Sequence, residues 1–396
     1  MNKNVWLLAC VQAMAMASGA LMVLVSGIFG ARVAPEATLA TLPMALMILG
    51  TATMVAPATL LMRQFGRKNV FLGCSAAGIV GSGVAVVAIN SASFWLFCGA
   101  AAVLGSAVAG FQQLRFAAIE SVDVAKAPKA MSHILLGGLV AAILGPELSS
   151  WGLFLTPDSF AGSFYLLAIL MVLSGVLLLF YQPMQQSVSE DQKAQSSRPL
   201  GEIFKQPQLV VAVAAASLGY ALMAFIMTAT PLHMHIHEGQ SLADTKLVIQ
   251  SHIIAMYLPS FFTGHLITRF GERVIIWAGI FSFAAVLTFA SLAATWWFYW
   301  LALVLLGVGW NFLFSAGTSL LPKSHHQNEK FKVLAVNEVC VFGMQALASL
   351  SAGAVLFALG WQTMMMVCIP LLMVLVALLL WWRPTQQPNL REQFEG

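Results

Sequence analysis

The stretch RQFGRK at residues 63–68 is echoed 205 residues later by TRFGER at residues 268–273. Each copy lies between two long apolar runs, and each places Phe-Gly directly before charged residues. Weak internal repeats of this size are typical of transporters assembled from two similar sets of membrane helices. The echo therefore predicts a chain of two related halves, with each copy in a short loop at the same position of its half.

The composition excludes a soluble enzyme. Of 396 residues, 60% are hydrophobic and only 9% are charged, and the mean hydropathy is +0.86, which is typical of a chain that lies mostly in a bilayer. A membrane helix needs about 20 apolar residues, so twelve helices would take roughly 240 residues and leave the rest for loops. Twelve apolar runs are present, at 5–28, 40–62, 69–90, 93–115, 131–154, 162–181, 207–230, 246–268, 273–294, 296–320, 333–358 and 361–382.

We predict an all-α membrane protein with twelve transmembrane helices in two six-helix halves. The halves are residues 1–181 and 207–383, joined by a linker at 182–206, and residues 384–396 form a tail. The first run is longer than the apolar core of a secretory signal, so we expect it to be retained as a helix.

Basic residues predict the orientation, because cytoplasmic loops are rich in Lys and Arg. One set of loops holds only Arg32 and Lys246. The opposite set holds Arg63, Arg67, Lys68, Lys126, Lys129, Lys193, Arg198, Lys205, Arg269, Arg273, Lys323, Lys330, Lys332, Arg383 and Arg391. We therefore expect a multi-pass protein of the bacterial inner membrane, with both termini and the linker in the cytoplasm.

Several classes of function lack a signal. The five cysteines all lie in apolar runs without a CxxC pair, which favours neither disulfides nor a zinc site. No Walker loop follows an apolar strand, so ATP hydrolysis is not indicated. Nothing indicates nucleic-acid binding or a hydrolytic triad. We expect no enzyme, no cofactor and a monomer surrounded by membrane lipid.

The loop at 63–68 resembles the signature of the major facilitator superfamily, Gly-x-x-x-Asp-Arg-x-Gly-Arg-Lys, at its Gly-Arg-Lys end. Both copies depart from that signature, since Arg63 and Thr268 stand where it has an acidic residue. The resemblance implies the fold of that superfamily and alternating access, with the substrate bound between the two halves near the bilayer midplane.

Two pairs of soft metal ligands lie on consecutive predicted helices. Met223 and Met227 are four residues apart, as are His252 and Met256, so each pair shares one helix face. Counted from the intervening loop, the pairs lie at matched depth. Thioether and imidazole ligands without a carboxylate favour Cu(I). The alternative is that the methionines fill the core and the histidine is satisfied there.

The four residues are similar to the MxxxM and HxxxM motifs of the CcoA-like copper importers (CalT family), a branch of the major facilitator superfamily. The segments at 256–264 and 307–312, and residues 336–338, 342–343 and 349–353, are also similar to that branch. The resemblance implies import of copper as the transported substrate, for assembly of cytochrome c oxidase, with Met223, Met227, His252 and Met256 as the metal ligands.

Two rival functions remain open. The same branch is similar to bacterial riboflavin transporters, so the cargo could be riboflavin or another small organic compound, held by Trp310, Asn311 and Phe312. The Gly-Pro turn before Glu147 resembles the signature of proton-coupled drug exporters, although the Gly pair that follows in that signature is absent.

Further polar residues lie along the predicted route. His233, His235 and His237 form a short His-rich tract beside the seventh helix and could capture metal, or they could be solvated loop residues. Glu147 and Glu338 lie within apolar runs, where a carboxylate is costly and needs a partner or a proton. They are candidates for proton coupling, or for structural pairing with Gln112, Gln113 or Arg115.

Overall fold

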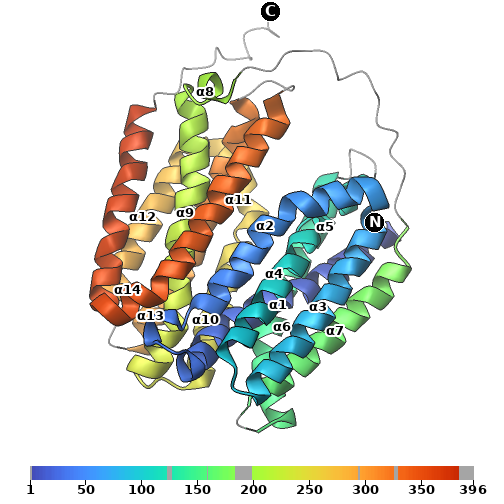
Figure 1. Cartoon of the computed structure of the whole chain (residues 1–396). Coiled ribbons are helices and arrows are strands. Elements are labelled where there is room, and N and C mark those ends of the chain that lie inside the picture. The colour runs from blue at the N-terminus through green and yellow to red at the C-terminus, as the bar shows by residue number, and fades with distance from the viewer. Residues whose placement is uncertain are drawn as a thin grey trace, which may run out of the picture.

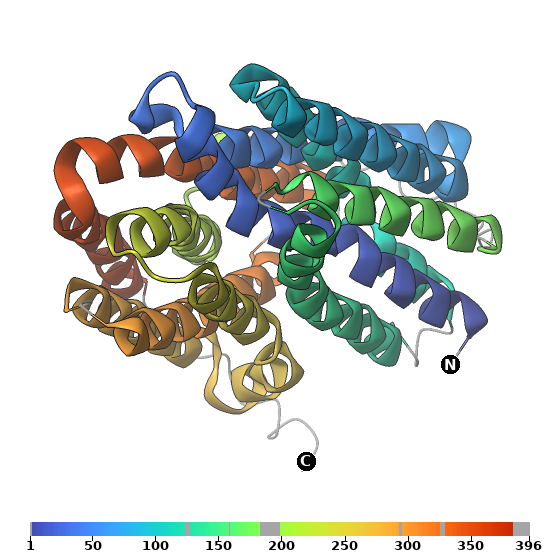
Figure 2. The same ribbon diagram turned by 90° about the horizontal axis from the view of Figure 1, so that it is seen from below.

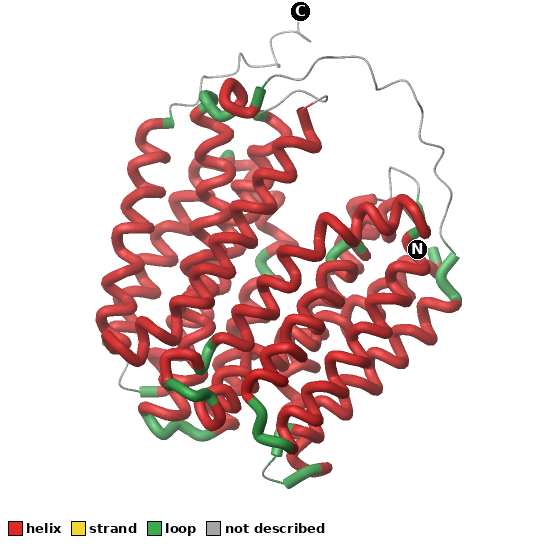
Figure 3. Tube along the Cα trace, viewed as in Figure 1, coloured by secondary structure: helices red, strands yellow, loops and turns green. Residues whose placement is uncertain are grey.

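The computed structural model describes residues 2–122, 127–157, 159–182, 199–292, 295–324 and 329–382, and all regular structure in these ranges is helical (Figure 3). The first half contains α1 (Lys3–Val33), η1 (Ala37–Leu39), α2 (Leu42–Phe65), α3 (Arg67–Asn90), α4 (Phe94–Phe111), α5 (Leu114–Glu120), α6 (Ala127–Leu155) and α7 (Ala161–Leu179). The second half contains α8 (Leu200–Ile203), α9 (Pro207–Leu232), η4 (His233–His237), α10 (Leu242–Tyr257), α11 (Ser260–Phe270), α12 (Glu272–Ser291), α13 (Trp296–Leu320), η5 (Leu321–Lys323) and α14 (Lys330–Trp381).

Ten helices in the described ranges are long and apolar enough to cross a membrane. The pair α10 and α11, bent by 42° at its break, adds an eleventh span. The 52-residue α14 contains the non-helical Gly360, with φ 80°. At about 1.5 Å per residue, it is more than twice as long as the roughly 30 Å apolar layer, so it supplies two spans. The fold is therefore the predicted arrangement of twelve membrane helices.

The structure corrects two of the predicted helices. The eighth run, predicted as one helix at 246–268, breaks between α10 and α11 at Leu258 and Pro259, because proline has no N–H for the helical ladder. Asn311 on α13 ties the two pieces together: its Nδ2 donates to the Met256 carbonyl oxygen (2.8 Å) and its Oδ1 accepts from Thr263 (2.7 Å). The fourth run ends as α4 at Phe111 and resumes as α5.

The buried apolar residues form two clusters. One is made of residues 5–181, and the other consists almost entirely of residues 203–382. Figure 1 shows the corresponding groups of helices diverging toward the end where α8 lies, which we call the linker end, and Figure 2 shows them side by side from below. Helix α1 begins and α14 ends at the linker end (Figure 1). The polar contacts between the halves described below lie at the opposite end.

The two echoed loops adopt the same backbone corner. Gly66 ends α2 with φ 82°, and Gly271 ends α11 with φ 81°. A residue with a side chain is strained at such positive φ, whereas glycine is not. The Phe-Gly dipeptide shared by RQFGRK and TRFGER therefore encodes one sharp corner, which leads directly into α3 in the first half and α12 in the second.

Candidate functional site

A cavity of about 170 Å³ lies between the two halves. The first half contributes residues of α1, α2, α4 and α6 to its wall, and the second half contributes residues of α9, α10 and α14. Because each water takes about 30 Å³ in the liquid, the cavity has room for roughly six waters. A single metal ion held directly by protein ligands would leave most of this space unfilled.

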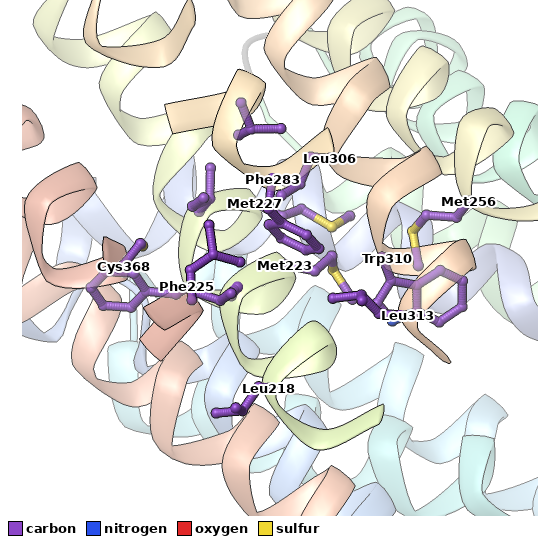
Figure 4. Close-up of a cluster of buried hydrophobic side chains, with 14 of the residues drawn as sticks. Leu218, Met223, Phe225, Met227, Met256, Phe283, Leu306, Trp310, Leu313 and Cys368 are labelled. Atoms are coloured by element: carbon purple, nitrogen blue, oxygen red, sulfur yellow. The ribbon is translucent and has the colours of Figure 1, made fainter. Parts of the chain in front are cut away.

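Six methionines line the cavity. Three of the predicted metal ligands, Met223, Met227 and Met256, are among them, and Figure 4 shows these three within the buried apolar cluster around Trp310. The other three come from the first half: Met16, Met44 and Met47. The three methionines of α9 and α10 thus line the same cavity, and the first half lines it with three further thioethers.

His252, the fourth predicted ligand, does not line the cavity. It is fully buried, and its Nδ1 lies 2.8 Å from the carbonyl oxygen of Leu303 on α13. With a proton on Nδ1, that nitrogen donates to the carbonyl and leaves Nε2 as an acceptor. Nε2 is buried without a hydrogen-bond partner. The structure thus brings together three of the four predicted ligands and places the imidazole between α10 and α13.

The three histidines that were predicted to capture metal have two different kinds of contact. His233 stacks on Trp361 with ring centroids 4.4 Å apart, and its Nδ1 lies 2.7 Å from the Tyr299 hydroxyl. His237 stacks on His233 at 5.6 Å. His235 instead has its Nδ1 2.8 Å from the Gln240 carbonyl oxygen. In the described residues no group of three His, Cys, Asp or Glu is arranged to hold a metal ion.

The two membrane carboxylates have different surroundings. Glu147 on α6 accepts a hydrogen bond from Lys246 on α10 (3.0 Å) and one from Gln250 (3.2 Å), so it forms an ion pair between the halves. Glu338 on α14 has a long hydrogen bond from Asn337 (3.4 Å) and lies in the electrostatic field of Arg115. Of the partners predicted for the carboxylates, only Arg115 is near one of them.

Three aromatic rings line the cavity, and the sequence analysis did not select them. They are Tyr220 on α9, Tyr257 on α10 and Phe342 on α14. The residues predicted to stack on an organic cargo do not line it. Trp310 is 5% exposed and stacks on Phe314, with centroids 5.2 Å apart, and Asn311 braces the break described above.

Two glutamines, Gln112 and Gln345, also line the cavity. Gln112 entered the sequence analysis only as a neighbour for a carboxylate, and Gln345 did not enter it. An uncharged amide inside an apolar run is costly in a membrane. That signal could have selected both residues.

Comparison with known proteins gives the chain a family. Residues 5–249 and 239–395 match the model of the Major Facilitator Superfamily. The riboflavin transporter RfnT of Brucella anthropi is 38% identical over 390 residues, which cover 97% of this chain and 96% of that protein. The uncharacterized MFS-type transporter YddS of Bacillus subtilis is 29% identical over 337 residues, 80% of this chain and 75% of that protein.

Solved structures show the same fold. The nucleoside transporter NupG superposes with a TM-score of 0.71 at 14% identity, over 96% of this chain and 99% of that one. A bacterial homologue of the human lysosomal transporter Spinster, in an inward-facing and occupied conformation, gives 0.70 at 13% identity, over 96% and 98%. The chain is a multi-pass membrane protein and a secondary transporter rather than an enzyme, and it belongs to the Major Facilitator Superfamily.

Proposed function

We propose that this protein transports riboflavin or a closely related flavin. The observation that carries the proposal is the 38% identity to a riboflavin transporter over nearly the full length of both chains. Copper was the principal expectation from the sequence, but no comparison names a copper transporter among the relatives reported above. The flavin alternative is therefore the better supported of the two.

The chemistry of the cavity fits a flavin ring. The isoalloxazine ring system is planar, with apolar faces and one polar edge that carries two carbonyls and an N–H. Tyr220, Tyr257 and Phe342 offer aromatic surface for stacking or edge contacts. The six thioethers add polarizable surface, and sulfur contacts aromatic rings favourably. A wall that is mostly apolar with a few polar groups is typical of sites for small organic ligands.

The arrangement of the halves suggests the route. They meet through Glu147 and Lys246 at the end opposite the linker, and they diverge toward the linker end (Figure 1). If the basic loops lie in the cytoplasm, this conformation faces inward. The cargo then enters from outside in the opposite conformation and leaves through the linker end, which makes the protein an importer of the inner membrane.

Uptake in a riboflavin auxotroph that lacks its own importer tests the proposal. We expect the chain to restore growth on scarce riboflavin and to accumulate labelled riboflavin. Tyr220→Ala removes one of the aromatic rings that line the cavity. It should lower uptake even when the variant is as abundant in the membrane as the wild type. No uptake by wild-type protein present in the membrane would overturn the proposal.

Copper import is the second candidate, and one specific observation favours it. Three predicted ligands line the cavity, and His252 donates from one ring nitrogen to a carbonyl while the other nitrogen is unpaired. Metal-binding histidines commonly have this arrangement. Copper accumulation that is lost in Met223→Leu and His252→Gln would support copper as the cargo. Accumulation equal to that of cells without the protein would exclude it.

A further inference from the structure

Gln112 and Gln345 line the same cavity from opposite halves of the protein. Gln112 directly follows α4 of the first half, and Gln345 lies within α14 of the second half. Neither side-chain amide forms a hydrogen bond with another residue that the structure describes, and both side chains are partly exposed. A primary amide offers two donor hydrogens and an acceptor oxygen, so each glutamine has unused capacity.

The two threonines that line the cavity, one from each half, already have hydrogen-bond partners. Thr51 donates to the carbonyl oxygens of Met47 (3.0 Å) and Gly105 (2.9 Å). The hydroxyl of Thr228 is 3.1 Å from that of Ser349. Among the lining residues, the amides of Gln112 and Gln345 are the groups that can both donate to a carbonyl and accept from an N–H of a cargo's polar edge, beside the hydroxyls of Tyr220 and Tyr257.

The helix register places Gln345 beside the aromatic part of the wall. Gln345 follows Phe342 by three residues, so the two share one face of α14. The Phe342 ring lies 6.3 Å from the ring of Tyr220. A flat ring held against these aromatic side chains would have its edge within reach of an amide on the same helix face.

We propose that Gln112 and Gln345 recognise the polar edge of the flavin ring, one from each half, and so determine the specificity of the site. This inference rests on the proposed flavin transport. The edge carries an N–H between two carbonyl oxygens. One glutamine accepts from the N–H and donates to a neighbouring carbonyl, and the other donates to the second carbonyl. Removing either amide leaves a ring carbonyl unpaired in a largely apolar cavity, which is costly.

Binding to the purified full-length protein in detergent tests this assignment, with quenching of flavin fluorescence as the readout. The probes are riboflavin and 3-methylriboflavin, in which a methyl group replaces the hydrogen of the edge N–H. We expect the wild type to bind riboflavin about tenfold more tightly, the effect of one well-placed hydrogen bond. Gln112→Leu and Gln345→Leu should each weaken riboflavin binding about tenfold. The variant that loses the acceptor for the edge N–H should bind the two probes nearly alike, whereas the variant that loses only the donor to the second carbonyl should weaken both probes and keep the discrimination.

The chain offers a matched control. Gln113→Leu makes the same chemical change one residue away, at a side chain that does not line the cavity, and should bind both probes as the wild type does. Thermal melting and gel filtration of each variant establish that it is folded. If either folded glutamine variant binds riboflavin as the wild type does, or if both variants keep the tenfold discrimination, the two amides do not recognise the edge.

The design separates the two proposals. A wild type that binds and imports riboflavin, but does not discriminate against the methylated analogue, would overturn the role of the glutamines and leave flavin transport standing. A wild type that neither binds nor imports riboflavin would overturn both. The result that supports the inference is weaker riboflavin binding in both glutamine variants, loss of discrimination in one of them, and wild-type behaviour of Gln113→Leu.

Discussion

Arg67 and Glu120 form a bidentate ion pair, with Nε 2.7 Å from one carboxylate oxygen and Nη2 2.6 Å from the other. Arg67 stands directly after the corner glycine of the first half. The residue in the same position of the second half is Glu272, and it pairs with Lys323 in η5, which directly follows α13. Both corners are thus tied to the fourth span of their own half by an ion pair of opposite polarity. The missing acidic residues at Arg63 and Thr268 do not leave these loops without ionic contacts.

The first prediction concerns the Arg67–Glu120 pair. Arg67→Glu should place two carboxylates together, lower the melting temperature and reduce uptake. A partly exposed ion pair contributes about 1 kcal/mol or less, and like charges at the same distance cost a similar amount. The double variant Arg67→Glu with Glu120→Arg should recover most of the lost uptake. Loss without recovery would mean that the charge order at this corner matters for more than pairing.

The second prediction separates the two cargoes at the methionines. Met223→Leu, Met227→Leu and Met256→Leu keep volume and apolarity and typically cost less than about 1.5 kcal/mol of stability. If the cargo is a flavin, each variant should retain riboflavin uptake within about tenfold, since only sulfur–ring contacts of about 0.3–1.5 kcal/mol are lost. If the cargo is copper, uptake of copper should fall to background. Uptake of both cargoes by wild-type and variant cells provides the comparison.

The third prediction concerns the histidine tract. His233 packs on Trp361 and bonds to Tyr299, so His233→Ala should lower stability by about 1–2 kcal/mol. Uptake by the His233→Ala variant should then fall to the same extent when cargo is scarce and when it is plentiful. His235→Ala, the matched control, removes one bond to a loop carbonyl and should melt near the wild type. If the histidines instead captured cargo before transport, their loss would reduce uptake only when cargo is scarce.

The fourth prediction distinguishes pairing from proton coupling at Glu147. Because Glu147 pairs with Lys246 across the halves, Glu147→Gln and Lys246→Met should reduce uptake to a similar extent. The charge exchange Glu147→Lys with Lys246→Glu should restore uptake, since it restores the pair. A carboxylate that carries the coupling proton would not be rescued by the exchange, and Glu147→Gln alone would then abolish the pH dependence of uptake. Glu338 forms no close ion pair with another residue that the structure describes, so Glu338→Gln is the informative comparison.

Most of the fold could be predicted from the sequence, because apolar length alone marks a membrane helix. The break at Pro259 was not predicted, although a proline inside a helical run interrupts the helical hydrogen bonds, because the hydropathy pattern continues across it. Its bracing comes from Asn311, which lies on a different helix and approaches only in the folded chain.

The site could be predicted in part. The four-residue spacing of Met223 and Met227 predicts that they share one helix face. The matched depth of Met256 on the next helix predicts that it lies near them. The spacing could not place His252, whose side chain turns to Leu303 on α13. It also missed Gln345 and the aromatic rings, because their shared cavity depends on how α14 packs against α9 and α2.

The corner at Gly360 has a consequence for motion. Spans eleven and twelve follow each other within α14 without an intervening loop, and Trp361 anchors the corner by donating to the Ala290 carbonyl oxygen (2.8 Å) and stacking on His233. A short corner that is fixed by these two contacts transmits displacement instead of absorbing it. Any tilt of the eleventh span, which carries Phe342 and Gln345 at the cavity, is therefore passed to the twelfth at the membrane-facing edge of the bundle. The thickness and stiffness of the surrounding lipid should then influence how readily the cavity changes shape.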